Sequence, residues 1–172
     1  MIGFILVLSP LVVVLRSTLQ PSNAPALTAG GGPPASVTGP ESRLLELVNA
    51  ERGLAGCPAL RLDDQLTASA RAHAADMADR AFASSITPDQ VGPDARARGL
   101  GYQGGVTEII AVGLPTAADV IAQWTNPRNE AAGPVLTKMI DCSRVSVGVA
   151  HLPARAKPIF GQGIWVMDLG DA

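Results

Sequence analysis

The sequence predicts an α+β domain in which helices pack on a mostly antiparallel sheet. Two observations lead to this fold class. Apolar side chains recur at helical spacing from residue 41 to about residue 81, whereas β-branched segments that alternate in polarity dominate after residue 145. The 172-residue chain has room for one such domain once the residues before position 41 are set aside.

The first two helices are expected to have clear boundaries. Thr38 and Glu41 resemble a capping box, and two glycines end this helix before Pro58. The second helix begins at Asp63 or Asp64, whose carboxylate can accept hydrogen bonds from the first turn, and it continues to about residue 81. The apolar positions are Leu44, Leu45, Leu47, Val48 and Leu54 in the first helix, and one face of the second holds Leu66, Ala70, His73 and Met77.

The later elements alternate between helix and strand. An irregular stretch near residue 90 leads into a short helical segment that ends near Arg98. Residues 107–112 are β-branched and predict a strand, and Thr116 caps a helix over residues 117–124. Residues 145–151 alternate as a strand does, and residues 159–169 supply one or two more strands.

The residues before the domain predict export. The apolar run of residues 2–15 would span about 21 Å as a helix, which is short of the roughly 30 Å bilayer core. This length is typical of a signal peptide over residues 1–26, cut after Ala26. No Lys or Arg precedes the run, so an uncleaved N-terminal anchor stays open. Residues 27–40, rich in Pro and Gly, predict a disordered linker, and we expect a secreted or cell-envelope protein.

The composition limits the partners that can be expected. A net charge of −2 gives no reason to expect nucleic acid, which is bound by clustered Lys and Arg. A membrane is expected to be contacted only through the leader, if the leader is uncleaved. Aromatic residues make up 3% of the chain, which argues mildly against a carbohydrate-stacking surface, and we expect Trp124 and Trp165 to lie in the core.

The segment from Leu44 to Phe82 resembles the opening of bacterial CAP domains, the relatives of cysteine-rich secretory proteins, antigen 5 and pathogenesis-related-1 proteins. This resemblance extends over about residues 41–170 and implies an α-β-α sandwich. The matching residues in the opening are Leu45, Asn49, Arg52, Pro58, Leu60, Met77 and Phe82. Further matches follow in the family's order: Arg96 to Tyr102, Thr107 to Ala111, Thr116 to Trp124, Val147 to Val149, and Trp165.

Cys57 and Cys142 are the two cysteines of the chain. In an exported protein an even pair forms a disulfide more often than it forms a metal site or supplies a nucleophile. Similar bacterial CAP domains carry cysteines near both places. We therefore expect a disulfide between Cys57 and Cys142.

The resemblance implies a cleft with two histidines and acidic residues, where some family members bind a divalent metal. Here Ser84 and Asn129 stand in the places of the two histidines, and Glu108 alone of the matched cleft residues is kept. Serine and asparagine are poor zinc ligands beside imidazole. We therefore expect a degenerate cleft with no metal, no cofactor and no confident catalytic residue.

Two interpretations of Glu108 stay open. It is either a remnant cleft residue that contacts a ligand or Asn129, or a structural residue. In the second case it forms an ion pair with Arg128 or another arginine, or it is exposed on an edge strand.

The other polar candidates are expected to be structural. We expect His73 at the margin of the core and His151 in solvent, with Arg96 and Arg98 as solvated helix charges. A triad drawn from Ser84, His73 and Asp76 lacks the strained turn that presents a nucleophilic serine.

The preferred hypothesis is therefore an exported, non-enzymatic binding or scaffold module. The family resemblance implies a lipid, a cell-wall component or a protein as its partner. The alternative is a peptide or ester hydrolase that uses the residual cleft around Glu108, with Asn129 as a helper. A purely structural role, in which only the surface matters, is the third hypothesis.

Overall fold

The computed structural model describes residues 36–153 and 161–171. Within them, four strands form one mixed sheet in the order β1-β3-β4-β2. The strands are β1 (Arg61–Leu62), β2 (Val106–Val112), β3 (Ser146–Pro153) and β4 (Gly163–Gly170). The β1–β3 pair is parallel, and β3–β4 and β2–β4 are antiparallel, so β2 is an edge strand. The α+β fold with a mostly antiparallel sheet is confirmed.

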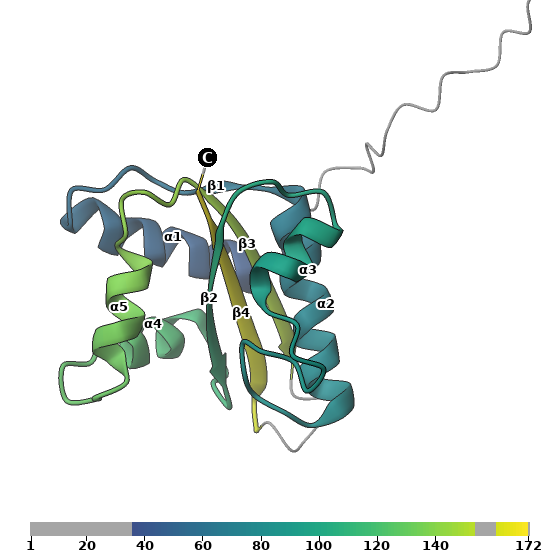
Figure 1. The fold of residues 1–172 in the computed structure, drawn as a ribbon. Coiled ribbons are helices and arrows are strands. Elements are labelled where there is room, and N and C mark those ends of the chain that lie inside the picture. The colour runs from purple at the N-terminus through teal and green to yellow at the C-terminus, as the bar shows by residue number, and fades with distance from the viewer. Residues whose placement is uncertain (1–35, 154–160, 172) are drawn as a thin grey trace, which may run out of the picture. The chain divides into compact units, whose positions relative to one another are not determined.

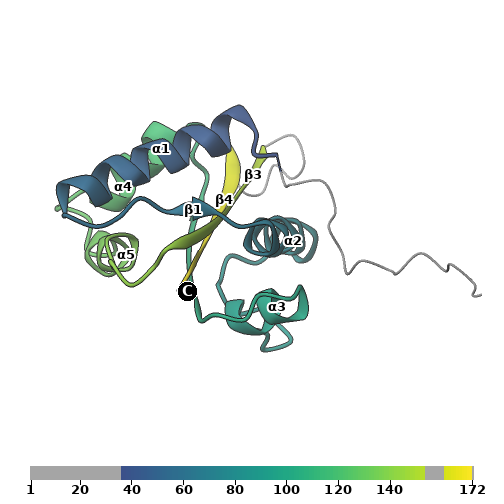
Figure 2. The same ribbon diagram turned by 90° about the horizontal axis from the view of Figure 1, so that it is seen from above.

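Five helices cover the two faces of this sheet (Figures 1 and 2). They are α1 (Gly39–Leu54), α2 (Asp64–Arg80), α3 (Pro93–Gly99), α4 (Ala117–Thr125) and α5 (Ala132–Met139). The layer of α1, α4 and α5 packs on Trp165, Met167 and Leu169 of β4 through the larger apolar cluster. In the opposite layer, α2 packs on the other face of β4 and on β3, and α3 lies beside α2 and packs on β2. This is the expected α-β-α sandwich, with both tryptophans in the core.

The predicted caps explain where the long helices begin. Thr38 and Glu41 form the capping box of α1, which starts two residues before the expected domain boundary. The Asp63 carboxylate accepts a hydrogen bond from the Leu66 amide at 2.9 Å, and Thr116 caps α4 in the same way. Because these side chains satisfy amide donors that have no partner within the helix, each start can be predicted within a few residues.

Two elements were not predicted. The strand β1 has only two residues and depends on pairing with β3, which lies more than eighty positions away. The helix α5 carries Gly133 and Pro134 in its first turn, where proline is tolerated because that N–H has no partner within the helix. Both residues weaken a helical pattern in the sequence, so the helix was missed.

The disulfide and a buried arginine join the same two segments. Cys57, after α1, is bonded to Cys142, after α5, as expected. Arg52 is fully buried, and its guanidinium donates to the carbonyl oxygens of Pro58, Met139, Asp141 and Arg144 at 2.8–3.0 Å. The Asn49 side chain fixes the segment before β1, because it donates a hydrogen bond to the Leu60 carbonyl and accepts one from the Leu60 amide. Asn49 and Arg52, two residues that carry the family resemblance, are therefore structural anchors.

The predicted leader, residues 1–26, lies outside the described residues, as do residues 27–35 of the predicted linker. None of the helices in the described part of the chain is both long and apolar enough to cross a bilayer.

Candidate functional site

Glu108 lies on β2 and faces the α2 layer. In the register of the sheet it is directly opposite Asp168 of β4, which in turn is opposite Gly148 of β3. Residues paired in this way share one face of a sheet. A side chain at Gly148 would place its Cβ 2.0 Å from the carbonyl carbon of Leu66 in α2. The glycine therefore lets α2 lie directly on the sheet and close one side of the space around the two carboxylates.

Side chains from four elements meet at Glu108. Its Oε1 lies 3.4 Å from Nε2 of His73 in α2, and its Oε2 accepts a hydrogen bond from Nη2 of Arg96 in α3 at 2.5 Å. His73 Nε2 also lies 2.9 Å from the carbonyl oxygen of Ser84, so this nitrogen carries the proton in the neutral ring. The residues His73, Arg96, Glu108 and Asp168 are called the buried charge cluster below.

Arg96 closes the cluster from the outside. Its Nη1 donates to the carbonyl oxygens of Ser85 and Val91 at 2.9 and 3.1 Å, so it also holds the loop between α2 and α3. The Arg96 side chain is 11% exposed, whereas the side chains of His73 and Glu108 are fully buried. Solvent therefore reaches only the guanidinium side of the cluster.

The pKa values follow from burial and from the count of charges. Burial and the neighbouring Asp168 raise the pKa of Glu108 to about 8, although Arg96 acts in the opposite direction. Burial also raises the pKa of Asp168, and burial with Arg96 lowers the pKa of His73 to about 4. With His73 neutral, one arginine faces two carboxyl groups. The two acids therefore share one proton near neutral pH, which leaves the cluster without net charge.

Several polar atoms in the cluster, and the hydroxyl of Ser69, lack a hydrogen bond of standard geometry. They are Ser69 Oγ, His73 Nδ1, Arg96 Nε, Glu108 Oε1 and both carboxylate oxygens of Asp168. Such atoms are costly to bury without a partner, and the Asp168 carboxyl group lies close enough to Ser69 and Glu108 for their side chains to act on its pKa. Within the described residues, no group of three or more His, Cys, Asp or Glu side chains is placed to hold a metal ion. A divalent cation does not fit this arrangement, because Arg96 already supplies positive charge to Glu108.

The other predicted cleft residues do not join Glu108. Ser84 is exposed, and its hydroxyl accepts a hydrogen bond from the Ile86 amide at 3.1 Å. Asn129 lies in the turn between α4 and α5, where its Oδ1 accepts from the Ala131 amide and its Nδ2 donates to the Gln123 carbonyl. Only the backbone carbonyl of Ser84, through His73, is connected to the cluster.

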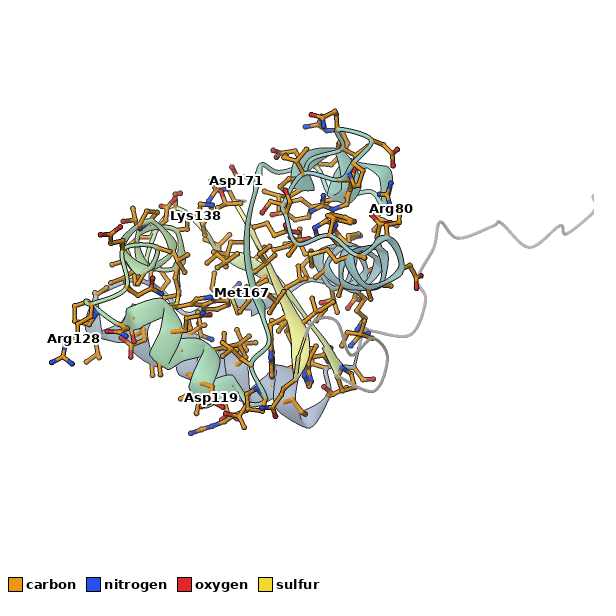
Figure 3. The ribbon with its side chains drawn as sticks, turned by 90° about the horizontal axis from the view of Figure 1, so that it is seen from below. Arg80, Asp119, Arg128, Lys138, Met167 and Asp171 are labelled. Atoms are coloured by element: carbon orange, nitrogen blue, oxygen red, sulfur yellow. A yellow bond between two sulfur atoms is a disulfide. The ribbon has the colours of Figure 1, made fainter. Side chains whose placement is uncertain are left out.

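The structure distinguishes between the alternatives for Glu108 and corrects the expectation for Arg96. Glu108 is buried and pairs with another arginine, Arg96. Arg128 points away from the fold at the α4–α5 turn (Figure 3). Arg96 was expected in solvent, but its long side chain reaches inward across the start of α3. Arg98 is exposed as expected.

The two histidines are also more buried than expected. His73 is fully buried, whereas the sequence placed it at the core margin. His151 is half-buried rather than solvated, because its ring stacks on Trp165 with the ring centroids 3.9 Å apart.

Asp168 was missed altogether. Alternation along β4 puts it on the same face as Ile164 and Val166, and this pattern could have identified a buried acid.

Comparisons with known proteins agree with this architecture. Residues 45–169 match the model of the cysteine-rich secretory protein (CAP) family. The protein YkwD of Bacillus subtilis is 32% identical over 108 residues, which cover 62% of this chain and 42% of that protein. The match thus spans less than half of this relative.

Solved structures show the same fold at low sequence identity. An outer surface protein from Borrelia burgdorferi aligns with a TM-score of 0.64 at 18% identity, covering 76% of this chain and 90% of that one. An extracellular protein containing an SCP domain from Bacillus anthracis aligns with a TM-score of 0.65 at 18% identity, covering 78% and 41%. With its family match, helix order and sheet in agreement, the chain belongs to the cysteine-rich secretory protein (CAP) family.

Proposed function

We propose that the chain is an exported, non-enzymatic CAP protein that acts outside the cell as a binding or scaffold module. Its partner is a lipid, a cell-wall component or a protein. The observation that carries this proposal is the closure of the cluster around Glu108. The acid at the family's cleft position is 3% exposed and is covered by the Arg96 guanidinium, so no substrate can reach its oxygens without displacing that side chain.

Export is supported by three features. The apolar run of residues 2–15 is typical of a leader, and a disulfide such as Cys57–Cys142 persists in oxidising compartments. Proteins with the same fold include an outer surface protein and an extracellular protein. Secretion into the medium and retention at the envelope are both compatible with these features.

A hydrolase is the second candidate, and one observation favours it. A carboxyl group with a pKa near 8 is protonated at neutral pH and could act as a general acid, and such shifts are frequent in active sites. The burial of Glu108 argues against it. The structure also places the predicted helper, Asn129, in a separate turn with its own hydrogen bonds.

Native mass spectrometry tests the proposal. The full chain is produced with its leader in a lipid-rich bacterial host, purified under mild conditions and measured without denaturation. A bound adduct that survives Glu108→Gln supports a binding module and gives the ligand class by its mass. A stoichiometric metal adduct that is lost in Glu108→Gln would contradict the proposal, because the cluster would then be a metal site.

A further inference from the structure

We infer that the groove between β2 and α5 binds an extended acidic peptide, which adds to the sheet as a further strand along β2. This inference rests on the proposed binding function and names the partner class. Three observations carry it: a free strand edge, two hollows that lie along it, and a lysine without an acidic partner.

The free edge follows from the register of β2. Gly113 donates to the Gly163 carbonyl at 2.8 Å, so residues 107, 109, 111 and 113 exchange hydrogen bonds with β4. The even-numbered residues of β2 direct their backbone groups away from the sheet. The Val106 amide is taken by Asp94, and the Glu108 carbonyl is approached by Lys138. Among the described residues, the outward backbone groups of Ile110 and Val112 have no such partner.

Two hollows lie along the groove, and each is lined by residues of both β2 and α5. The larger, about 410 Å³, is formed by Thr107 of β2 with Thr137 and Lys138 of α5, together with Ile140 and Asp141. The smaller, about 150 Å³, includes Ile110 of β2 with Ala132 and Val135 of α5. Thr107 and Ile110 are about 10 Å apart along a strand. Because Thr107 and Ile110 are three positions apart, side chains three positions apart on an extended peptide could enter both hollows.

Lys138 gives the groove its charge preference. It is exposed on α5 beside β2 (Figure 3), and its Nζ contacts only the Glu108 carbonyl, at a long 3.4 Å. No carboxylate of the described residues lies within ion-pair distance of it. Asp141, in the same hollow, is already engaged by the amide and hydroxyl of Ser143 and by Arg144. Of the charged side chains that line this hollow, Lys138 is therefore the one without an ion-pair partner among the described residues.

A peptide with an acidic side chain could form an ion pair with Lys138 and backbone hydrogen bonds with the free edge of β2. Its carboxylate would draw Nζ away from the Glu108 carbonyl and free that oxygen for a backbone N–H of the peptide. Main-chain hydrogen bonds to Glu108, Ile110 and Val112 would then supply affinity, while the two hollows select peptide side chains. Without such a ligand, Lys138 protects the edge from pairing with other strands.

Selection from a random dodecapeptide phage library on the purified full chain tests this inference. The enriched peptides are synthesised, and their binding is measured by fluorescence anisotropy with the wild type, Lys138→Glu and the matched control Arg43→Glu on α1. We expect acidic peptides rich in β-branched residues, at least tenfold weaker binding by Lys138→Glu and unchanged binding by Arg43→Glu. Methylation of alternate backbone nitrogens of the peptide should abolish binding. In NMR spectra of the protein, the amide signals that move on peptide binding should centre on Ile110 and Val112.

The inference is overturned if no peptide is enriched. It is also overturned if Lys138→Glu binds the selected peptides as well as the wild type does, or if the amide shifts lie outside the groove. A fatty-acid adduct that protects the groove amides would replace the peptide with a lipid and would also refute it. Failure of the proposed function is detected by a different measurement. Turnover of substrates by the wild type would contradict a non-enzymatic module, and this result does not depend on Lys138.

Discussion

The buried charge cluster predicts that the domain loses stability as the pH rises above about 6.5. Glu108 has a raised pKa, so its carboxyl group binds a proton more tightly in the folded state than in the unfolded chain. Stability from this group is complete below its ordinary pKa of 4.5 and is lost as the pH rises towards 8. Asp168, whose pKa is also raised, acts in the same direction.

His73 opposes this effect only in the acid range. Its folded-state pKa is about 4 against an ordinary value of 6.5, so its contribution is complete above pH 6.5 and is lost as the pH falls to 4. His151, whose pKa is lowered by burial, acts with His73. Each pH unit between the two pKa values of a group corresponds to about 1.4 kcal/mol. Glu108 and His73 therefore nearly cancel between pH 4.5 and 6.5, and the carboxyl pair alone acts above that range.

The free energy of unfolding should fall by about 2 kcal/mol between pH 6.5 and pH 8. Urea denaturation of the purified, oxidised chain at several pH values measures this slope. Glu108→Gln keeps the shape and leaves one acid opposite Arg96, so it should reduce the slope and be more stable than the wild type at pH 8. Glu46→Gln, an exposed control on α1, should retain the slope. A wild type whose stability is constant or rises from pH 6.5 to 8 would refute the shared proton.

Three further predictions concern the framework. Gly148→Ala should destabilise the domain by about 3 kcal/mol in urea denaturation, because its Cβ meets the α2 backbone; a change below about 1 kcal/mol would contradict this close packing. Arg52→Met should cost about 3–5 kcal/mol because four carbonyl oxygens lose their donor, and a near-neutral change in the unfolding midpoint would show that they are not buried as described. Replacing Cys57 and Cys142 together by serine should lower the free energy of unfolding by up to about 4 kcal/mol. The effects of this double replacement and of Arg52→Met should not be additive, because the disulfide and Arg52 hold the same two segments. Additive effects would argue against that coupling.

The sequence predicted those parts of the fold that local chemistry determines. Three helices could be located by their N-caps, Thr38, Asp63 and Thr116, and two of them, α1 and α2, also by their apolar spacing. Helix caps and apolar helix faces are determined by residues that are close in the sequence. The strand β1 could not be found in this way, since a two-residue strand exists only through its partner. The helix α5 was hidden by its own Gly133 and Pro134.

The site was predicted less completely than the fold. Glu108 was identified through its place in the family pattern, but its partners come from α2, α3 and β4 and are related to it only by the folded packing. The reach of Arg96 across its helix has no sequence signal, whereas alternation in β4 could have identified Asp168. Ser84 and Asn129 match the family's cleft in sequence but form separate local hydrogen bonds in the structure.

Turnover assays on the wild type and Glu108→Gln test the central claim most directly. Both proteins are incubated with a panel of peptides and esters at pH 6.5, and the masses of substrates and products are followed over time by mass spectrometry. A closed, non-catalytic cluster predicts that no substrate is converted by either protein above the rate in buffer. Conversion by the wild type that is lost in the correctly folded Glu108→Gln would contradict the account and make Glu108 a catalytic acid.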